Sequence, residues 1–136
     1  MVIYNLNSTL IAIFEILIAV GLIGLWVYFF LVENKNPEKS KVYLGFERSF
    51  PVPDLGWATP SLIIAAIGLL SEQPFGVFFT ITSGSALLFL GLLDISFNIQ
   101  NGGYSTNIGD TIMNLFINLI CVIFGSLFMI FAWGQF

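Results

Sequence analysis

Four long apolar stretches, separated by short polar segments, dominate the sequence. A membrane-spanning helix needs about 20 apolar residues, with a usual range of about 17–25. Three of the stretches meet this length, and the second does so if its helix begins near Val52 or Pro53. The stretches are Leu10–Val32, Leu55–Leu70, Phe75–Ile99 and Thr111–Trp133. The pattern predicts an all-α, polytopic integral membrane protein that forms a four-helix up-down bundle. We expect helices at about 9–32, 53–71, 75–99 and 111–133.

The composition supports this interpretation. The chain of 136 residues is 57% hydrophobic and 9% charged, whereas a soluble domain carries about 25% charged residues. No polar segment is long enough to build a core of its own, so we predict one membrane domain, 1–136, and no soluble domain. The expected surroundings are the lipid bilayer, with a second copy or a membrane partner subunit and without nucleic acid.

The basic residues indicate an orientation in the membrane. All four lie in the polar loop 33–52: Lys35, Lys39, Lys41 and Arg48. Because short loops rich in Lys and Arg stay on the cytoplasmic side, we predict a cytoplasmic loop 33–52 and both termini outside. Aromatic residues would mark the inner interface (Trp26, Tyr28 and Trp57) and the outer one (Trp133), as aromatic belts do.

Small and polar residues recur at helical spacing in every stretch. Such faces meet other helices rather than lipid, so each predicted helix has an inward face. The faces are Ser8, Ala12, Glu15 and Ala19; Ser61, Ala65, Gly68 and, at the helix end, Glu72; Thr80, Gly84, Leu87, Gly91, Asp94 and Asn98; and Asp110, Asn114, Asn118, Cys121 and Gly125.

Two acids, Glu15 and Asp94, lie well inside the apolar stretches. A charged acid at mid-helix costs at least about 2.5–3.5 kcal/mol, and no predicted span holds a Lys or Arg to neutralise it. These acids must therefore be protonated, hydrated or satisfied by a cation, unless Arg48 folds back to the inner one. At about 1.5 Å per residue they lie about 15 Å apart along the membrane normal, so we expect no direct contact.

The proton- or ion-binding candidates are Glu15, Asp94, Asn114 and Asn118, with Asp54, Asp110 and Asn98 as secondary candidates. Each also has a structural interpretation. Asp94 could be a helix-end acid bonded to Asn98, and Asp110 the cap of the fourth helix. Asn114 and Asn118 fit interhelical hydrogen-bond partners better than ligands.

The residue types restrict the chemistry. The chain has no histidine and a single cysteine, Cys121. This argues against histidine-ligated haem or zinc, Ser-His-Asp hydrolysis and disulfide redox chemistry. We therefore expect no cofactor, no metal centre and no catalytic residue.

Three functions are compatible with these features. The first is a transporter- or channel-like subunit that handles a proton or small cation through intramembrane carboxylates. At the level of fold the chain resembles small multidrug transporters, which have four short helices with one glutamate in the first, a place that Glu15 occupies. The long first loop and the remaining sequence differ, so the likeness implies no membership. The alternatives are a non-catalytic scaffold or accessory subunit and, less favoured, an intramembrane enzyme using Asp54 and Asp94.

Overall fold

The computed structural model describes residues 5–136, and this part of the chain is helical without strands. Four helical segments are long and apolar enough to cross a membrane, which confirms the predicted number: Leu6–Lys35, Lys41–Leu70, Pro74–Asn101 and Ile108–Trp133. The individual elements are α1 (Leu6–Leu31), η1 (Glu33–Lys35), α2 (Lys41–Glu47), α3 (Pro51–Pro53), η2 (Asp54–Ala58), α4 (Thr59–Leu70), α5 (Pro74–Asn101) and α6 (Ile108–Trp133).

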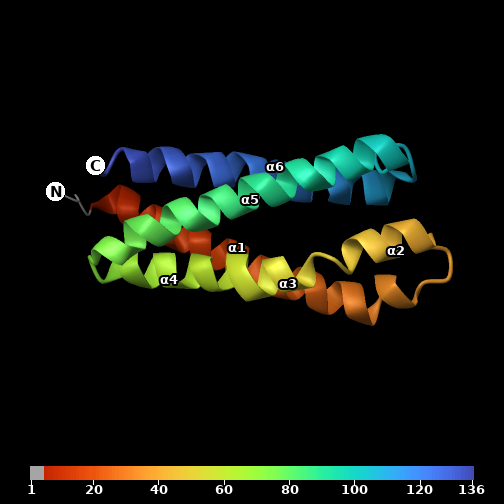
Figure 1. Cartoon of the computed structure of the whole chain (residues 1–136), viewed down its shortest axis with the longest axis horizontal. Coiled ribbons are helices and arrows are strands. Elements are labelled where there is room, and N and C mark those ends of the chain that lie inside the picture. Colours follow the sequence, from red (N-terminus) through yellow and green to blue (C-terminus); the bar gives the residue numbers. More distant parts are fainter. Residues whose placement is uncertain (1–4) are drawn as a thin grey trace.

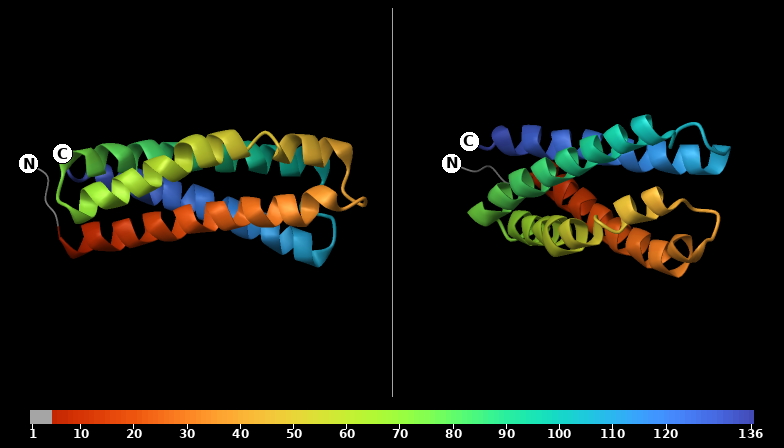
Figure 2. Two further views of the ribbon diagram at one scale, coloured as in Figure 1. Left: turned by 90° about the horizontal axis from the view of Figure 1, so that it is seen from below. Right: turned by 45° about the vertical axis from the view of Figure 1, so that its right-hand side comes forward.

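The long helices run lengthwise beside one another (Figure 1). The start of α1, the C-terminus and the α4–α5 hairpin lie at one end of the bundle, here called the terminal end. The α1–α2 and α5–α6 connections lie at the other, here called the loop end. Helix α4 packs against α1 and α5, and α5 packs against α6 (Figure 2). The fold therefore has two distinct ends, each able to hold its own polar groups.

The predicted inward faces form the core. Ala12, Ala65 and Leu87 are fully buried, and so is the acid Glu15. Outward positions carry mostly large apolar side chains, which suits helices that face lipid. One member of the predicted faces departs from the pattern, because Glu72 is exposed in the α4–α5 turn.

Glycines allow the closest helix contacts. A Cβ added at Gly84 would lie 2.8 Å from the carbonyl oxygen of Gly125, so α5 and α6 touch through their backbones there. Gly68 and Gly76 face each other in the same way across the α4–α5 hairpin. These glycines serve packing within the chain.

The segment predicted as a polar loop, 33–52, is largely helical. Ser40 caps α2, because its Oγ accepts a hydrogen bond from the Tyr43 backbone N–H at 3.1 Å. Leu44 and Phe50 are buried with Trp26 and Phe29 of α1. Side-chain burial thus fixes α2 on the bundle.

Within the second spanning segment, the helix that begins at Pro51 and leads into α4 contains a wider turn, the π-helical element η2. Pro60 lies just after this turn, and proline lacks the N–H that an α-helix would use while its ring crowds the carbonyl four residues earlier. A π turn accommodates both effects, and such turns are frequent at functional sites. The turn carries Asp54 as its first residue.

The fourth helix begins at Ile108 rather than near residue 111, and the expectation that Asp110 caps it is wrong. Asn107 is the cap, since its Oδ1 accepts from the Asp110 backbone N–H at 2.8 Å. The Asp110 carboxylate accepts instead from Asn107 Nδ2 at 2.9 Å and from Lys39 Nζ at 3.1 Å. A cap must precede the first turn, whereas Asp110 lies within it.

We expect Glu72→Gly to raise stability. Glu72 has φ 56°, a left-handed backbone conformation that residues with a side chain disfavour. This conformation ends α4, and the Gln73 backbone N–H then donates to the Gly68 carbonyl oxygen at 2.8 Å. Relief of this conformation should add roughly 0.5–1 kcal/mol after the entropic cost of glycine. Thermal unfolding in detergent measures it. Gln73→Gly is the control, because Gln73 is extended and should lose stability, and a lower midpoint for Glu72→Gly would contradict the expectation.

Candidate functional site

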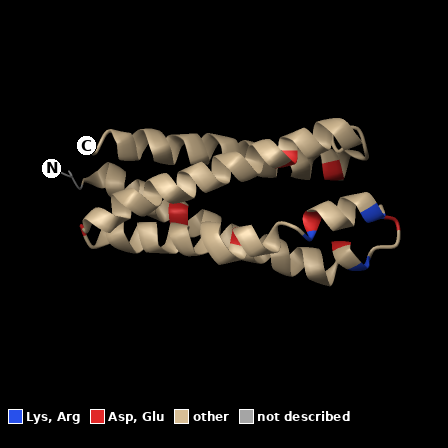
Figure 3. Ribbon diagram, in the orientation of Figure 1, with Lys and Arg blue, Asp and Glu red and all other residues tan. Residues whose placement is uncertain are grey.

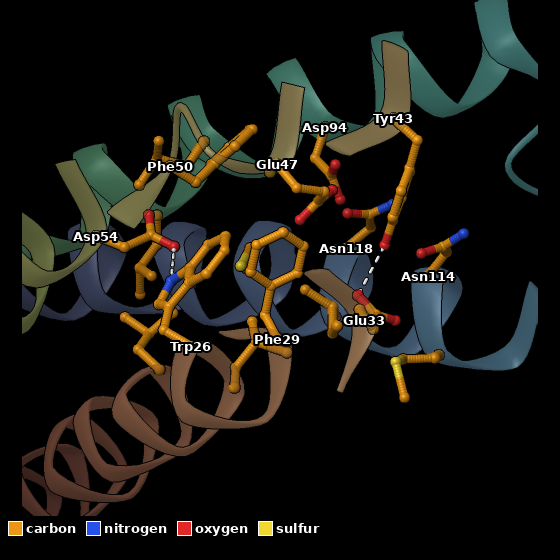
Figure 4. A pocket seen from close by; sticks show the side chains of 18 residues that line it. Trp26, Phe29, Glu33, Tyr43, Glu47, Phe50, Asp54, Asp94, Asn114 and Asn118 are labelled. Carbon is orange, nitrogen blue, oxygen red and sulfur yellow. Dashed lines mark hydrogen bonds between the residues drawn. The ribbon is translucent and has the colours of Figure 1, made fainter. Parts of the chain in front are cut away.

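Four carboxylic acids line one cavity near the loop end. The cavity measures about 60 Å³ (Figure 4). The acids come from four different elements: Glu33 of η1, Glu47 of α2, Asp54 of η2 and Asp94 of α5. None of the 18 described residues that line the cavity is a Lys or Arg. Basic residues also gather at the loop end, yet they lie outside this cavity (Figure 3).

Asp54 is the acid held by a single strong donor. Its side chain is 5% exposed, and its Oδ2 accepts from Trp26 Nε1 at 2.8 Å. The prediction that Trp26 lies in an interfacial aromatic belt is therefore wrong. Its indole is 3% exposed and packs among Phe29 and Phe50, because its N–H finds a buried partner in Asp54.

Glu47 of α2 and Asp94 of α5 lie near each other in the cavity. Figure 4 shows their carboxyl groups turned toward one another, beside the side chain of Asn118. Asn98 bonds to Asp94, as the helix-end interpretation expects: its Nδ2 donates to the Asp94 carbonyl oxygen at 3.0 Å, and its side chain also hydrogen-bonds the Asp94 carboxyl group. Arg48 does not reach this acid, since its Nε donates to Asn34 Oδ1 at 2.7 Å. The two carboxyl groups thus share the cavity without a basic partner.

Glu33 and Tyr43 mark the boundary between the cavity and an open groove. Tyr43 Oη donates to Glu33 Oε2 at 3.0 Å, which ties η1 to α2. The groove, here called the vestibule, has a volume of about 580 Å³. It shares Glu33, Tyr43, Met113 and Asn114 with the cavity. The cavity and the vestibule are therefore adjacent at the loop end, with these side chains between them.

The two asparagines of α6 bond to the α5–α6 connection rather than to a neighbouring helix. Asn114 Nδ2 donates to the Gly103 carbonyl oxygen at 2.8 Å, and Asn118 Nδ2 donates to Tyr104 Oη. Asn118 is 2% exposed, and its Oδ1 has no hydrogen-bond partner within residues 5–136. One buried acceptor on the cavity wall is therefore left open.

Glu15 forms a second, separate polar centre toward the terminal end. It is fully buried, and its Oε1 lies 2.7 Å from Thr80 Oγ1. Its Oε2 has no partner among the described residues. Glu15 lines neither the cavity nor the vestibule, which agrees with the expectation that it does not contact Asp94.

The structure therefore sorts the candidates into three groups. Asp94, Asn114, Asn118 and the secondary candidate Asp54 line the cavity, while Asn98 and Asp110 line the vestibule. Glu15 stands apart. Sequence reasoning missed Glu33, Tyr43 and Glu47, although Tyr43 and Glu47 are spaced four residues apart and so share one helical face.

Within residues 5–136, no group of three or more Asp, Glu, Cys or His side chains could hold a metal ion. No protein-family model, curated protein or solved structure matches the chain.

Proposed function

We propose that the protein is a multi-pass membrane protein, and that it acts as a transporter- or channel-like subunit that takes up a proton or a small cation in the cavity. One observation carries the proposal: Glu33, Glu47, Asp54 and Asp94 line a single cavity that has no Lys or Arg on its walls. The separate buried acid, Glu15, adds a second group that can hold a proton.

Electrostatic repulsion among the acids supports this function. Carboxylates that share a poorly hydrated site repel one another, and each loses hydration when it is ionised there. Asp54 accepts from the Trp26 indole, Glu33 accepts from the Tyr43 hydroxyl, and the Asn98 side chain hydrogen-bonds Asp94. These neutral donors offset the repulsion only in part. Uptake of protons or of a cation would relieve the remaining repulsion. The vestibule offers a route for either from the loop end.

The proposed orientation follows the positive-inside rule. The loop end, with the four basic residues, would face the cytoplasm, and both termini would lie outside. The cavity would then open toward the cytoplasm through the vestibule. Glu15 would lie nearer the outer side.

A scaffold or accessory role remains the second candidate, because one small-residue surface is left open. Gly21 and Gly24 are exposed on α1, and a Cβ at either would meet nothing within 4 Å. A second copy or another membrane helix could pack closely there. In that case Gly21→Leu would change the assembly state in mild detergent without changing transport. The enzyme hypothesis has less support, since one of its two acids, Asp54, is engaged by Trp26.

The test is flux through the reconstituted protein. In liposomes with an imposed pH gradient, the doubly neutralised variant Glu47→Gln/Asp94→Asn should lower proton or cation flux by roughly tenfold or more, because amides cannot take up a proton at this site. Glu72→Gln is the matched control, since Glu72 is exposed in a turn, and its flux should equal that of the unmodified protein. Equal flux in all three proteins would refute the proposal.

A further inference from the structure

Most of the polar groups that the protein turns into the cavity are hydrogen-bond acceptors. The side-chain N–H groups of Asn114 and Asn118 donate to the α5–α6 connection, and the Tyr43 hydroxyl donates to Glu33. What remains facing the cavity includes the carboxyl groups of Glu47 and Asp94 and the open Oδ1 of Asn118. A buried acceptor without a partner is costly, so this arrangement favours a ligand that brings several donors.

Aromatic rings form much of the remaining wall. Trp26, Phe29, Tyr43 and Phe50 all line the cavity. Trp26 and Phe50 are stacked at a centroid distance of 6.5 Å, and Trp26 meets Phe29 edge to face at 5.3 Å. Ring faces attract cations, particularly where water is scarce. Tyr43 already contacts one ammonium group on its vestibule side, since Lys39 Nζ lies 5.0 Å from its ring centroid.

The size of the cavity limits the ligand. Its volume of about 60 Å³ is well below that of an engineered apolar cavity of about 150 Å³ that holds benzene. A compact charged group fits, whereas a ring or a quaternary ammonium is too bulky. The adjoining vestibule, at about 580 Å³, has room for the rest of a small metabolite.

We propose that the cavity binds a primary ammonium group, the head of a small amine whose remainder lies in the vestibule. The three N–H donors of the head meet the carboxyl groups of Glu47 and Asp94 and the Oδ1 of Asn118. This assignment rests on the proposed function, because it names the cation that the site takes up. It also accounts for the open acceptor on Asn118, which a proton carried by one of the acids would satisfy only in part.

An ammonium group suits these acids better than a bare metal ion does. The carboxyl groups come from separate elements and form no group that could hold a metal within the described chain. An ammonium ion needs only acceptors around its N–H bonds, and it gains from the aromatic walls as well.

Binding tests the inference directly. Methylammonium is the probe, measured by saturation-transfer NMR and by thermal unfolding of the full chain in detergent. Because methylammonium has only two heavy atoms, we expect a Kd of roughly millimolar order. Tetramethylammonium, which lacks N–H donors, should bind at least about tenfold more weakly. The same comparison with K⁺ separates an ammonium site from a general monovalent-cation site.

A variant locates the site. Glu47→Gln/Asp94→Asn should weaken methylammonium binding by roughly tenfold or more, whereas Glu72→Gln should leave it unchanged. Should the double variant fail to fold, the comparison of the three cations on the unmodified protein decides. Absence of methylammonium binding, or equal binding of methylammonium, tetramethylammonium and K⁺, would overturn the inference. If amine binding fails while the flux difference persists, only the substrate class is wrong; if binding persists without flux, the transport proposal is wrong.

Discussion

Replacing Gly84 with leucine should push α5 away from α6 and destabilise the fold by roughly 1–3 kcal/mol or more, because there is no space for a side chain between the two backbones. A Cβ at Gly84 would lie 2.8 Å from the Gly125 carbonyl oxygen and 3.1 Å from Phe128 Cβ. Phe128 is fully buried, so it has little freedom to withdraw. Thermal or denaturant unfolding in detergent measures the effect.

Gly21→Leu provides the matched control for this loss. Gly21 also lies in a long apolar helix, but a Cβ there meets nothing within 4 Å. Both substitutions gain the same helix propensity, so any difference between them reports the space around the glycine. Equal unfolding midpoints for the two variants would show that α5 and α6 do not touch at Gly84.

The sequence predicts the long helices and their inward faces because both follow from local periodicity. In α5, the spacing of Thr80, Gly84, Leu87 and Gly91 places small or apolar groups on one side, and all four are buried. Nothing beyond helical geometry is needed for this inference. The start of α6 was harder to predict from the sequence, since both Asn107 and Asp110 are suitable caps by residue type and only the backbone conformation decides between them.

The cavity was only partly predictable, because two of its walls depend on tertiary packing. Asp94 and Asn118 were recognised as polar residues in apolar helices. Glu47 was not, because α2 has only seven residues and is held by burial of Leu44 rather than by its own helix propensity. Its approach to Asp94 joins positions 47 residues apart by number (94 − 47 = 47), which no local pattern encodes.

The burial of Trp26 could not be predicted from the sequence either. A tryptophan near the end of an apolar stretch is typical of an interfacial belt, and the sequence offered no sign of a buried partner. That partner, Asp54, is presented by the π turn before Pro60. Recognising it would have required the register of η2, which only the packed structure supplies.

The contacts of the Thr80 hydroxyl indicate whether Glu15 carries a proton. Thr80 Oγ1 lies 2.7 Å from Glu15 Oε1 and 2.8 Å from the Gly76 carbonyl oxygen. A hydroxyl carries one proton, and a carbonyl oxygen carries none. With an ionised Glu15, the single Thr80 proton would be shared between two acceptors. Each contact is a full two-centre hydrogen bond only if Glu15 supplies a second proton, donating to Thr80 while Thr80 donates to Gly76. This geometry favours a neutral Glu15, as its complete burial does.

Glu15→Gln should therefore fold normally and lose proton flux to the level of empty liposomes. A glutamine amide can donate to Thr80 as the neutral acid does, so we expect the free energy of unfolding to change by less than about 1 kcal/mol. The amide cannot release or take up the proton, so transport that passes through Glu15 stops. Flux under a pH gradient measures the loss of transport. Infrared difference spectroscopy measures the loss of the proton, because the carbonyl band of a protonated carboxyl group should disappear in the variant.

Thr80→Val distinguishes the role of the Glu15 proton in transport from the role of the Glu15–Thr80 hydrogen bond in stability. It keeps the acid and nearly the same side-chain volume but removes the hydroxyl. Glu15 then loses its hydrogen bond with Thr80, and stability should fall by about 1–3 kcal/mol. The acid can still exchange its proton, so flux should persist in the folded fraction. Strong destabilisation by Glu15→Gln, with the carbonyl band absent from the unmodified protein, would instead indicate an ionised Glu15 that glutamine cannot replace. Full flux in Glu15→Gln would remove Glu15 from the path and leave the cavity at the loop end as the only acidic site in the proposed function.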